Sequence, residues 1–236
     1  MRKSVRLLHS ILPKRITLEP EIIQLLAKVY PTLDFNRIYF FNGMPWFMKH
    51  AFAVGITLPG TYNLSGINIY LNGCNQRSTE GLGLIVHELF HGLQYKELHG
   101  GYGVGFMRSF LVFYLTEYFL LLRKNIGSQP LFVASKSAYD CHPMETPAYQ
   151  HEFEFKTQYH ALGLDGMLAD FPATCIVEQS GYQFQHSRFT LLPGVLITLL
   201  FMLIKPIIEL ILLLFVPVLW VLELPFKLFQ KQRKYE

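Results

Sequence analysis

The chain of 236 residues is long enough to form one domain of ordinary size with an appended segment. Hydrophobic residues make up 51% of the sequence, charged residues only 16%, and the mean hydropathy of +0.25 is high for a soluble protein, which points to membrane contact. The net charge of +4 is mild and the basic residues gather near the two ends, so we do not expect nucleic-acid binding. Three widely spaced cysteines, Cys74, Cys141 and Cys175, do not form a disulfide framework and favour free thiols in a reducing compartment.

Residues 1–18 form a basic N-terminal segment with a short apolar patch that Pro13 ends. No small-residue cleavage site follows the patch, so we do not expect a secretory signal. The segment instead predicts a short amphipathic helix that lies on a membrane or on the following domain.

Residues 19–177 show the pattern of a mixed α and β domain. Apolar residues at helical spacing predict a helix over residues 19–30. Three short strands are predicted next, at residues 37–41, 51–58 and 67–71, and a turn signal that contains glycine follows each of them. We expect the last strand to lie at the edge of the sheet, where it can pair with an extended peptide.

The next predicted helix carries the most informative motif of the chain. His87 and His91 are four residues apart, so a helix places both imidazoles on one face, where they can bind one Zn²⁺ at about 2.0–2.1 Å. Glu88 projects in a different direction and is placed to accept a proton from a water that the metal activates. Ser78 or Thr79 can cap the start of the helix. Its apolar residues recur at helical spacing and predict a buried helix: Leu82, Ile85, Val86, Leu89, Phe90 and Leu93.

A zinc site of this kind needs a third protein ligand from a later element of the chain. Glu145 opens a predicted helix, and the small Ala148 one turn further on lets that helix pack close to the helix of His87. Glu152 lies two turns from Glu145 on roughly the same face. It is the alternative ligand, or a partner that supports a ligand histidine without touching the metal.

These residues resemble a known family. His87-Glu88-x-x-His91 followed by Glu145-x-x-Ala148 resembles the gluzincin branch of zinc metallopeptidases, and in particular the minimal gluzincins of bacteria, whose His-Glu-Leu-x-His-x-x-Gln pattern Gln94 also fits. The resemblance covers about residues 37–155. It implies a zincin-like fold, Zn²⁺ as the cofactor, a peptide or protein substrate, Glu88 as the general base, and three metal ligands: His87, His91 and Glu145.

The chain departs from the larger gluzincins at Tyr149, where many of them carry an Asp that supports a ligand histidine. The reaction also needs a hydrogen-bond donor for the negative oxygen that develops in the transition state. The sequence does not choose between four available side chains, among which we single out Tyr149 and His160. The four are Tyr139, Tyr149, Tyr159 and His160.

Two stretches raise the question of a membrane span. Residues 106–122 are very apolar, but Arg108 and Glu117 interrupt them, and we predict a buried helix that packs against the helix of His87. After a polar linker over residues 178–188, residues 189–236 hold two apolar runs that Lys205 and Pro206 separate, and a basic end. One helix through both runs would be about 50 Å long against a hydrocarbon core of about 30 Å. We therefore expect a membrane-associated helical hairpin, either spanning or re-entrant.

The hairpin also predicts on which side of the membrane the domain lies. It would return the basic end of the chain to the side of the domain, and basic segments favour the cytoplasmic face. The sequence therefore predicts an α+β, zincin-like domain that acts as a membrane-anchored zinc metallopeptidase. The alternative is a non-catalytic, membrane-associated interaction protein that zinc stabilises, although such a site needs no unligated carboxylate at Glu88. A hydrolase of non-peptide amides or esters would use the same site.

Overall fold

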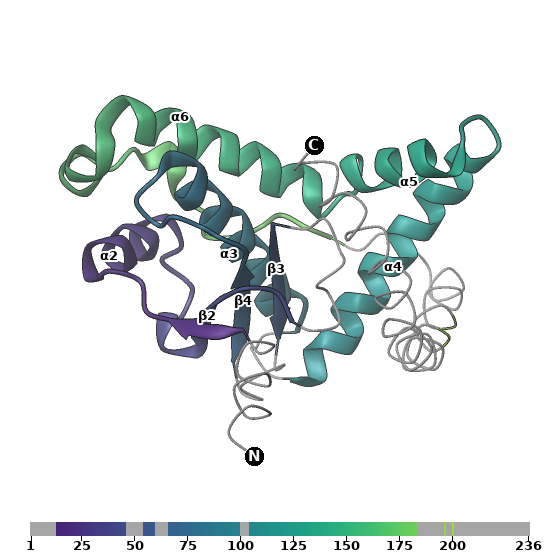
Figure 1. The fold of residues 1–236 in the computed structure, drawn as a ribbon, viewed down its shortest axis with the longest axis horizontal. Helices are drawn as coiled ribbons and strands as arrows, with labels where there is room; N and C mark the ends of the chain where they lie inside the picture. The colour runs from purple at the N-terminus through teal and green to yellow at the C-terminus, as the bar shows by residue number, and fades with distance from the viewer. Residues whose placement is uncertain are drawn as a thin grey trace, which may run out of the picture. The chain divides into compact units, whose positions relative to one another are not determined.

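The computed structural model describes residues 13–45, 54–59, 66–99 and 104–183, together with Leu196 and Leu200. The chain divides into two units, Met1–Gly194 and Val195–Glu236, and the sheet and its helices belong to the first. The described part of this unit is a mixed α and β structure with a four-stranded sheet and five α-helices (Figure 1), which confirms the predicted small sheet and helices. In chain order the elements are β1 (Lys14–Ile16), α2 (Pro20–Val29), η1 (Phe35–Arg37), β2 (Ile38–Asn42), β3 (Gly55–Pro59), β4 (Ile67–Leu71), α3 (Thr79–His99), α4 (Val104–Ile126), α5 (Leu131–Asp140), α6 (Glu145–Ala169) and η3 (Ala173–Cys175).

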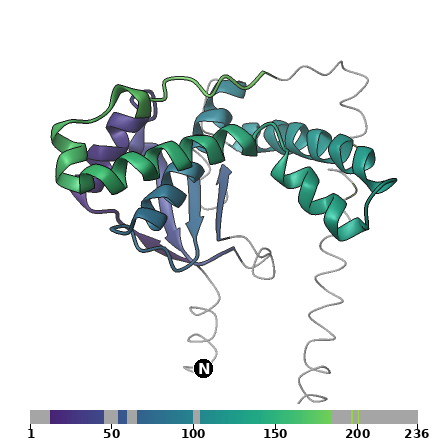
Figure 2. The same cartoon turned by 90° about the horizontal axis from the view of Figure 1, so that it is seen from above.

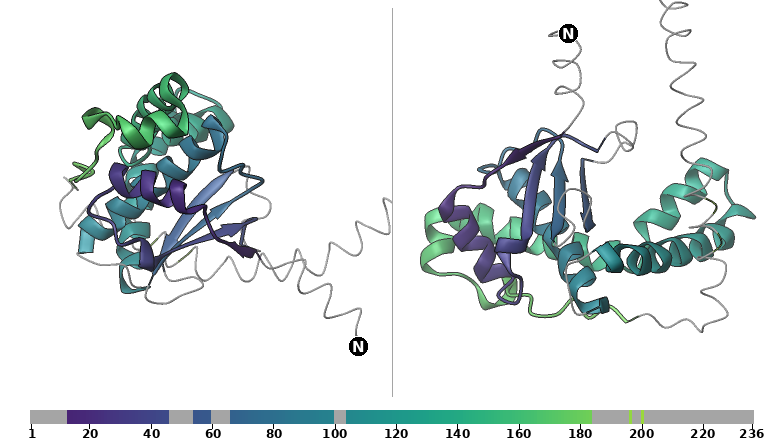
Figure 3. Two further views of the ribbon diagram at one scale, coloured as in Figure 1. Left: turned by 90° about the vertical axis from the view of Figure 1, so that its left-hand side faces the viewer. Right: turned by 90° about the horizontal axis from the view of Figure 1, so that it is seen from below.

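The sheet has the strand order β1-β2-β4-β3, with β2 parallel to β4 and the two outer pairs antiparallel. Ile69 of β4 therefore lies opposite Phe40 of β2 on one side and Thr57 of β3 on the other. Helices α2, α3 and α6 lie on one side of the sheet (Figure 3). A small cluster on the sheet contains Phe41, Met44 and Tyr70.

The expectation that residues 67–71 form the edge of the sheet is wrong. These residues form β4, which lies between β2 and β3 and is buried along its whole length. Apolar side chains point to both faces, as is usual for an interior strand, and the one amide, Asn68, donates a hydrogen bond to the carbonyl of Leu58. The edge beside the helix of His87 is β3 instead.

The structure also adds two elements that the sequence did not reveal. Residues 14–16 of the basic N-terminal segment form β1, with Arg15 opposite Phe41 of β2, while residues 1–12 lie outside the described residues. Residues 131–140 form α5, which packs beside α4 as a helical hairpin (Figure 1). A strand of three residues is too short for its alternation to be recognised.

Helix α3 is the centre of the fold. It packs against β3 and β4 on one side and against α6 on the other, and α6 runs across it (Figure 2). Its start is capped as expected, because the hydroxyl of Ser78 accepts the N–H of Gly81 at 3.0 Å. All six apolar residues predicted for this helix are buried: Leu82, Ile85, Val86, Leu89, Phe90 and Leu93.

The predicted helix over residues 106–122 is α4, and it packs against α3 as expected. Its described side chains become less buried along the helix: Phe110 and Thr116 are buried, whereas Arg123 and Lys124 are exposed. Among the helices that the structure describes, none combines the length and the hydropathy needed to cross a membrane. The predicted apolar hairpin at residues 189–236 lies outside the described residues, apart from Leu196 and Leu200.

The first part of the predicted linker is bound to the domain. The hydroxyl of Thr32 donates to the carbonyl of Glu178 at 3.2 Å, and the N–H of Ser180 donates to the Glu97 carboxylate at 2.7 Å. The domain therefore extends several residues into the polar stretch that the sequence assigned to the linker.

At the start of α3, Gly81 packs closely against the backbone of the preceding turn. A Cβ added there would lie 1.9 Å from the backbone oxygen of Asn75. We expect Gly81→Ala to displace the preceding turn and to lower the free energy of unfolding by about 1–3 kcal/mol, measured by urea denaturation. Gly127→Ala is the matched control, because its Cβ would have no neighbour within 4 Å. Equal midpoints for the two variants would contradict the role of Gly81.

Candidate metal centre

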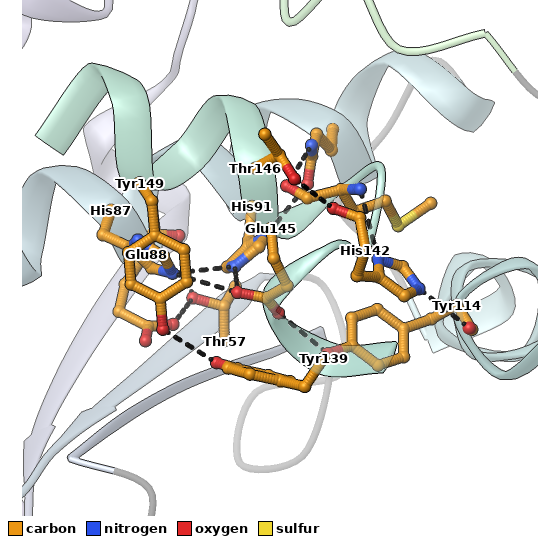
Figure 4. A network of polar contacts seen from close by, with 12 residues as sticks. Thr57, His87, Glu88, His91, Tyr114, Tyr139, His142, Glu145, Thr146 and Tyr149 are labelled. Carbon is orange, nitrogen blue, oxygen red and sulfur yellow. Dashed lines mark hydrogen bonds and ion pairs between the residues drawn. The ribbon is translucent and has the colours of Figure 1, made fainter. Parts of the chain in front are cut away.

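Three buried side chains converge where α3 meets the start of α6 (Figure 4). His87 and His91 come from α3, and Glu145 is the first residue of α6. The two imidazole Nε2 atoms are 3.2 Å apart, and Glu145 Oε2 lies 3.4 Å from that of His87 and 3.5 Å from that of His91. The side chains are only 4%, 7% and 4% exposed. This group could hold a metal ion, and it unites the three residues that the sequence predicted as ligands.

The hydrogen bonds of Gln94 determine which ring nitrogen of His91 faces a hydrogen-bond acceptor. Gln94 is fully buried, and its amide nitrogen donates to the carbonyl of Met144 at 3.0 Å, which fixes the orientation of the amide. Its oxygen therefore faces His91 Nδ1 at 2.8 Å and accepts a hydrogen bond from it. With the proton on Nδ1, neutral His91 presents the lone pair of Nε2 to the centre of the group.

Glu152 acts on His87 in a comparable way. Its Oε2 lies 3.2 Å from His87 Nδ1, a hydrogen-bond distance, although the angle is not that of a fully formed hydrogen bond. The carboxylate favours a proton on Nδ1, so the Nε2 lone pair of His87 also faces inward. Lys156, one turn further along α6, lies 3.6 Å from the other oxygen of Glu152. The structure thus places Glu152 beside His87, on the side away from the group.

Glu145 is oriented by a hydrogen bond to one of its two oxygens. The hydroxyl of Tyr114 on α4 donates to Oε1 at 2.8 Å, which leaves Oε2, buried and without a hydrogen bond, facing the two histidines. Burial raises the pKa of Tyr114 and keeps this donor protonated. His142 fixes the turn before Glu145: its Nδ1 accepts the N–H of Met144 and its Nε2 donates to the backbone oxygen of Tyr114.

The electrostatics of the group favour positive charge at its centre. Burial opposes the charge on His87, but the carboxylates of Glu145 and Glu152 outweigh it and raise the pKa of His87 to about 9. Burial likewise acts against the charged form of Glu145, yet the imidazoles of His91 and His87 hold the pKa of this carboxyl well below its usual range. Both shifts have the sign expected of a site that attracts a cation.

Glu88 lies beside the group without belonging to it. The hydroxyl of Thr57 on β3 is 2.7 Å from its Oε2 and 2.8 Å from its backbone oxygen, and it donates to one of them. A Cβ on Gly55 would lie 2.4 Å from Glu88 Oε1, so only glycine leaves room for the carboxylate against β3. Burial raises the pKa of Glu88, and the charges of His91 and His87 act against that shift. The side chain is thus held between the sheet and the histidines.

A cavity of about 990 Å³ opens over His87 and Glu88. On one side it is lined by β3 and by the loop between β4 and α3, and on the other side by α5 and α6. Tyr139 and Tyr149 both line it, and their hydroxyls are 3.2 Å apart. The ring of Tyr149 lies against that of His87, with 4.5 Å between centroids (Figure 4). Two of the four tyrosine and histidine donors considered from the sequence are therefore at this site.

The structure does not bring the other two donors into the site. Tyr159 is buried against Phe155. His160 is exposed, fifteen residues beyond Glu145, which corresponds to about 22 Å along α6.

Several residues of the site were missed in the sequence. Thr57 and Gly55 sit in a predicted strand and Tyr114 in a predicted buried helix, and no spacing links them to the motif. His142 is not part of the motif either, although its place three residues before Glu145 could have indicated its role at the start of the helix.

Comparison with protein families, with curated proteins and with solved structures found no match to this chain. The site is therefore interpreted from its own geometry.

The Gln94 side chain is predicted to determine metal affinity. Gln94→Ala leaves both His91 Nδ1 and the Met144 carbonyl without their partner, so one ligand loses its orientation and the start of α6 loses a contact. We expect affinity for Zn²⁺, measured by competition with a chromophoric chelator, to fall about 10–100-fold. Gln24→Ala on the exposed side of α2 is the control and should bind as the wild type does. Unchanged affinity in Gln94→Ala would overturn the role of Gln94.

Proposed function

We propose that the chain is a membrane-anchored, zinc-dependent metallopeptidase. The observation that supports this most is the combination of three buried, converging lone pairs with a fourth polar group, Glu88, that is held beside them and not among them. A site that only stabilises a fold has no use for a buried carboxylate in that place.

The distances within the group favour zinc. An ion bound tetrahedrally at about 2.0–2.1 Å requires ligand atoms about 3.3–3.4 Å apart, whereas octahedral binding at the same bond length requires about 2.8–3.0 Å. The three separations of 3.2, 3.4 and 3.5 Å agree with the tetrahedral value. Two imidazoles and one carboxylate also form a donor set that catalytic zinc sites use, with a fourth position left for water or substrate.

The residues around the group would each have a separate role in peptide hydrolysis. Bound zinc would supply Lewis acidity toward the scissile carbonyl and toward water. His87, His91 and Glu145 would hold it. Glu88 would accept the proton of the attacking water and pass it to the leaving amine, with Thr57 and Gly55 keeping its carboxylate in place.

Tyr139 and Tyr149 are the donors proposed for the transition-state oxyanion. Burial raises the pKa of each hydroxyl, so both remain protonated and able to donate. Their hydroxyls contact each other at the cavity wall, and the ring of Tyr149 rests on a ligand histidine. His160 is not proposed for this role, because it lies far along α6.

A peptide is the proposed substrate because the edge strand of the sheet lines the cavity. Val54 and Gly55, at the start of the edge strand β3, line it. An extended peptide can add to such an edge through backbone hydrogen bonds, which do not depend on its sequence. The apolar runs of residues 189–236 support the membrane anchor, and the basic end of the chain supports the cytoplasmic face.

The metal centre is tested by elemental analysis of the purified chain. We expect about one zinc per wild-type chain and its loss in both His87→Ala and Glu145→Ala, because each change removes one of three ligands. Tyr159→Phe, a change far from the group, is the control and should keep its zinc. If Glu145→Ala keeps its zinc, the third ligand would be Glu152 and not Glu145. A folded wild type that takes up no zinc when zinc is supplied would overturn the proposal.

The role of Glu88 separates an enzyme from a zinc-stabilised interaction protein. Glu88→Gln keeps the size and the contact with Thr57 but cannot accept a proton. We expect zinc content and melting temperature to stay as in the wild type, while cleavage of a mixed peptide library, followed by mass spectrometry, falls at least about 100-fold. Cleavage at the wild-type rate would refute the general-base assignment. A wild type that cuts ester or non-peptide amide substrates but no peptide would assign the same site to that hydrolase class.

A further inference from the structure

The turn between α4 and α5 exposes an unusual number of apolar side chains. Ile126 ends α4 with 51% of its surface exposed, and Leu131, Phe132 and Val133 begin α5 with 63%, 79% and 48% exposed. We call these four residues, with the neighbouring Arg123 and Lys124, the hairpin tip. The turn lies at the end of the α4–α5 hairpin that is farthest from the sheet (Figures 1 and 2). Exposing three consecutive large apolar side chains to water costs free energy, so we expect a partner to cover this surface.

The charge around the hairpin tip has one sign. From Tyr118 to Tyr139 the chain has three basic residues, Arg123, Lys124 and Lys136, and no acidic one. Lys136 pairs with Asp140, but Arg123 and Lys124 have no carboxylate partner among the described residues. Apolar side chains that protrude beside unpaired basic ones are the pattern of a segment that inserts into the headgroup region of an anionic bilayer.

We propose that the hairpin tip docks onto an anionic lipid surface, with Phe132 and Leu131 inserted and Arg123 and Lys124 at the headgroups. This contact is separate from the apolar C-terminal runs, and it does not depend on the metal centre. The other occupants fit less well. Residues 189–222 carry a single carboxylate, Glu209, to meet the basic charges, and a second copy of the hairpin tip would bring like charges together.

The docking would bring the cavity to the membrane. Phe132, Ser135 and Lys136 of α5 line the same cavity that opens over His87 and Glu88. A lipid-bound hairpin tip therefore places the entrance of the cavity at the bilayer surface. Segments of membrane proteins close to the headgroups would then reach the site more readily than soluble peptides.

Lipid contact can be measured on the full chain in vesicles. Cys74, Cys141 and Cys175 are replaced by alanine, Phe132→Cys is labelled with the fluorophore NBD, and the protein is reconstituted into phosphatidylcholine vesicles that contain a nitroxide lipid, with or without about 25% phosphatidylserine. Phe153→Cys is the matched control, since Phe153 of α6 is 71% exposed but lies outside the hairpin tip. In the vesicles with phosphatidylserine, we expect the nitroxide lipid to quench the label at position 132 at least twofold and to leave the label at position 153 nearly unchanged.

A second pair of substitutions tests the charge. Arg123→Glu with Lys124→Glu should abolish at least half of the quenching at position 132, while circular dichroism stays as in the parent protein. Quenching that survives this reversal, or that is equal at positions 132 and 153, would overturn the proposal. A label at 132 that is shielded from water without being quenched would also overturn it and would assign the surface to the C-terminal runs or to a second copy.

Discussion

The carbonyl of Met144 determines which way His91 of the candidate metal centre faces. It can only accept a hydrogen bond, so it orients the amide of Gln94, and the amide oxygen in turn requires the proton of His91 to be on Nδ1. The lone pair of Nε2 is then turned toward the lone pairs of His87 and Glu145 inside a buried group. Lone pairs repel, and in a buried place only a cation or a shared proton makes their convergence favourable. The rest of the centre depends on this constraint.

Helix α3 can serve this centre because successive residues of a helix point about 100° apart. His87 and His91 share one face and meet α6, whereas Glu88 points to β3 and rests on Thr57 and Gly55. A histidine of the candidate metal centre and a carboxylate outside it can thus be neighbours in the chain and still contact different layers of the fold. The same packing explains why the helix is buried on almost every side while it carries four buried polar side chains, His87, Glu88, His91 and Gln94.

The sequence predicted the features that depend on the spacing of residues within one helix. The pairing of His87 with His91 follows from helical periodicity, and the apolar residues of α3 follow from the same period. Helical faces left Glu145 and Glu152 as alternatives for the third residue, and the family resemblance implied Glu145, which the structure places in the group. The edge of the sheet was predicted wrongly, because an edge depends on which strands pair across the fold and not on the composition of residues 67–71. Tyr114 and Thr57 each contact a site residue 31 positions away, and no local pattern encodes such a distance.

The cavity connects the two proposals through one helix. Helix α5 contributes Tyr139, beside the metal centre, and Phe132, whose ring is mostly exposed at the other end of the same helix. Since Phe132 and Tyr139 are seven positions apart on one helix, a lipid surface at Phe132 would lie about 10 Å along the helix from Tyr139. An extended peptide covers this distance in about three residues. A site arranged in this way would favour substrates that leave the bilayer as an extended segment, and it would act only on the first few residues outside the membrane.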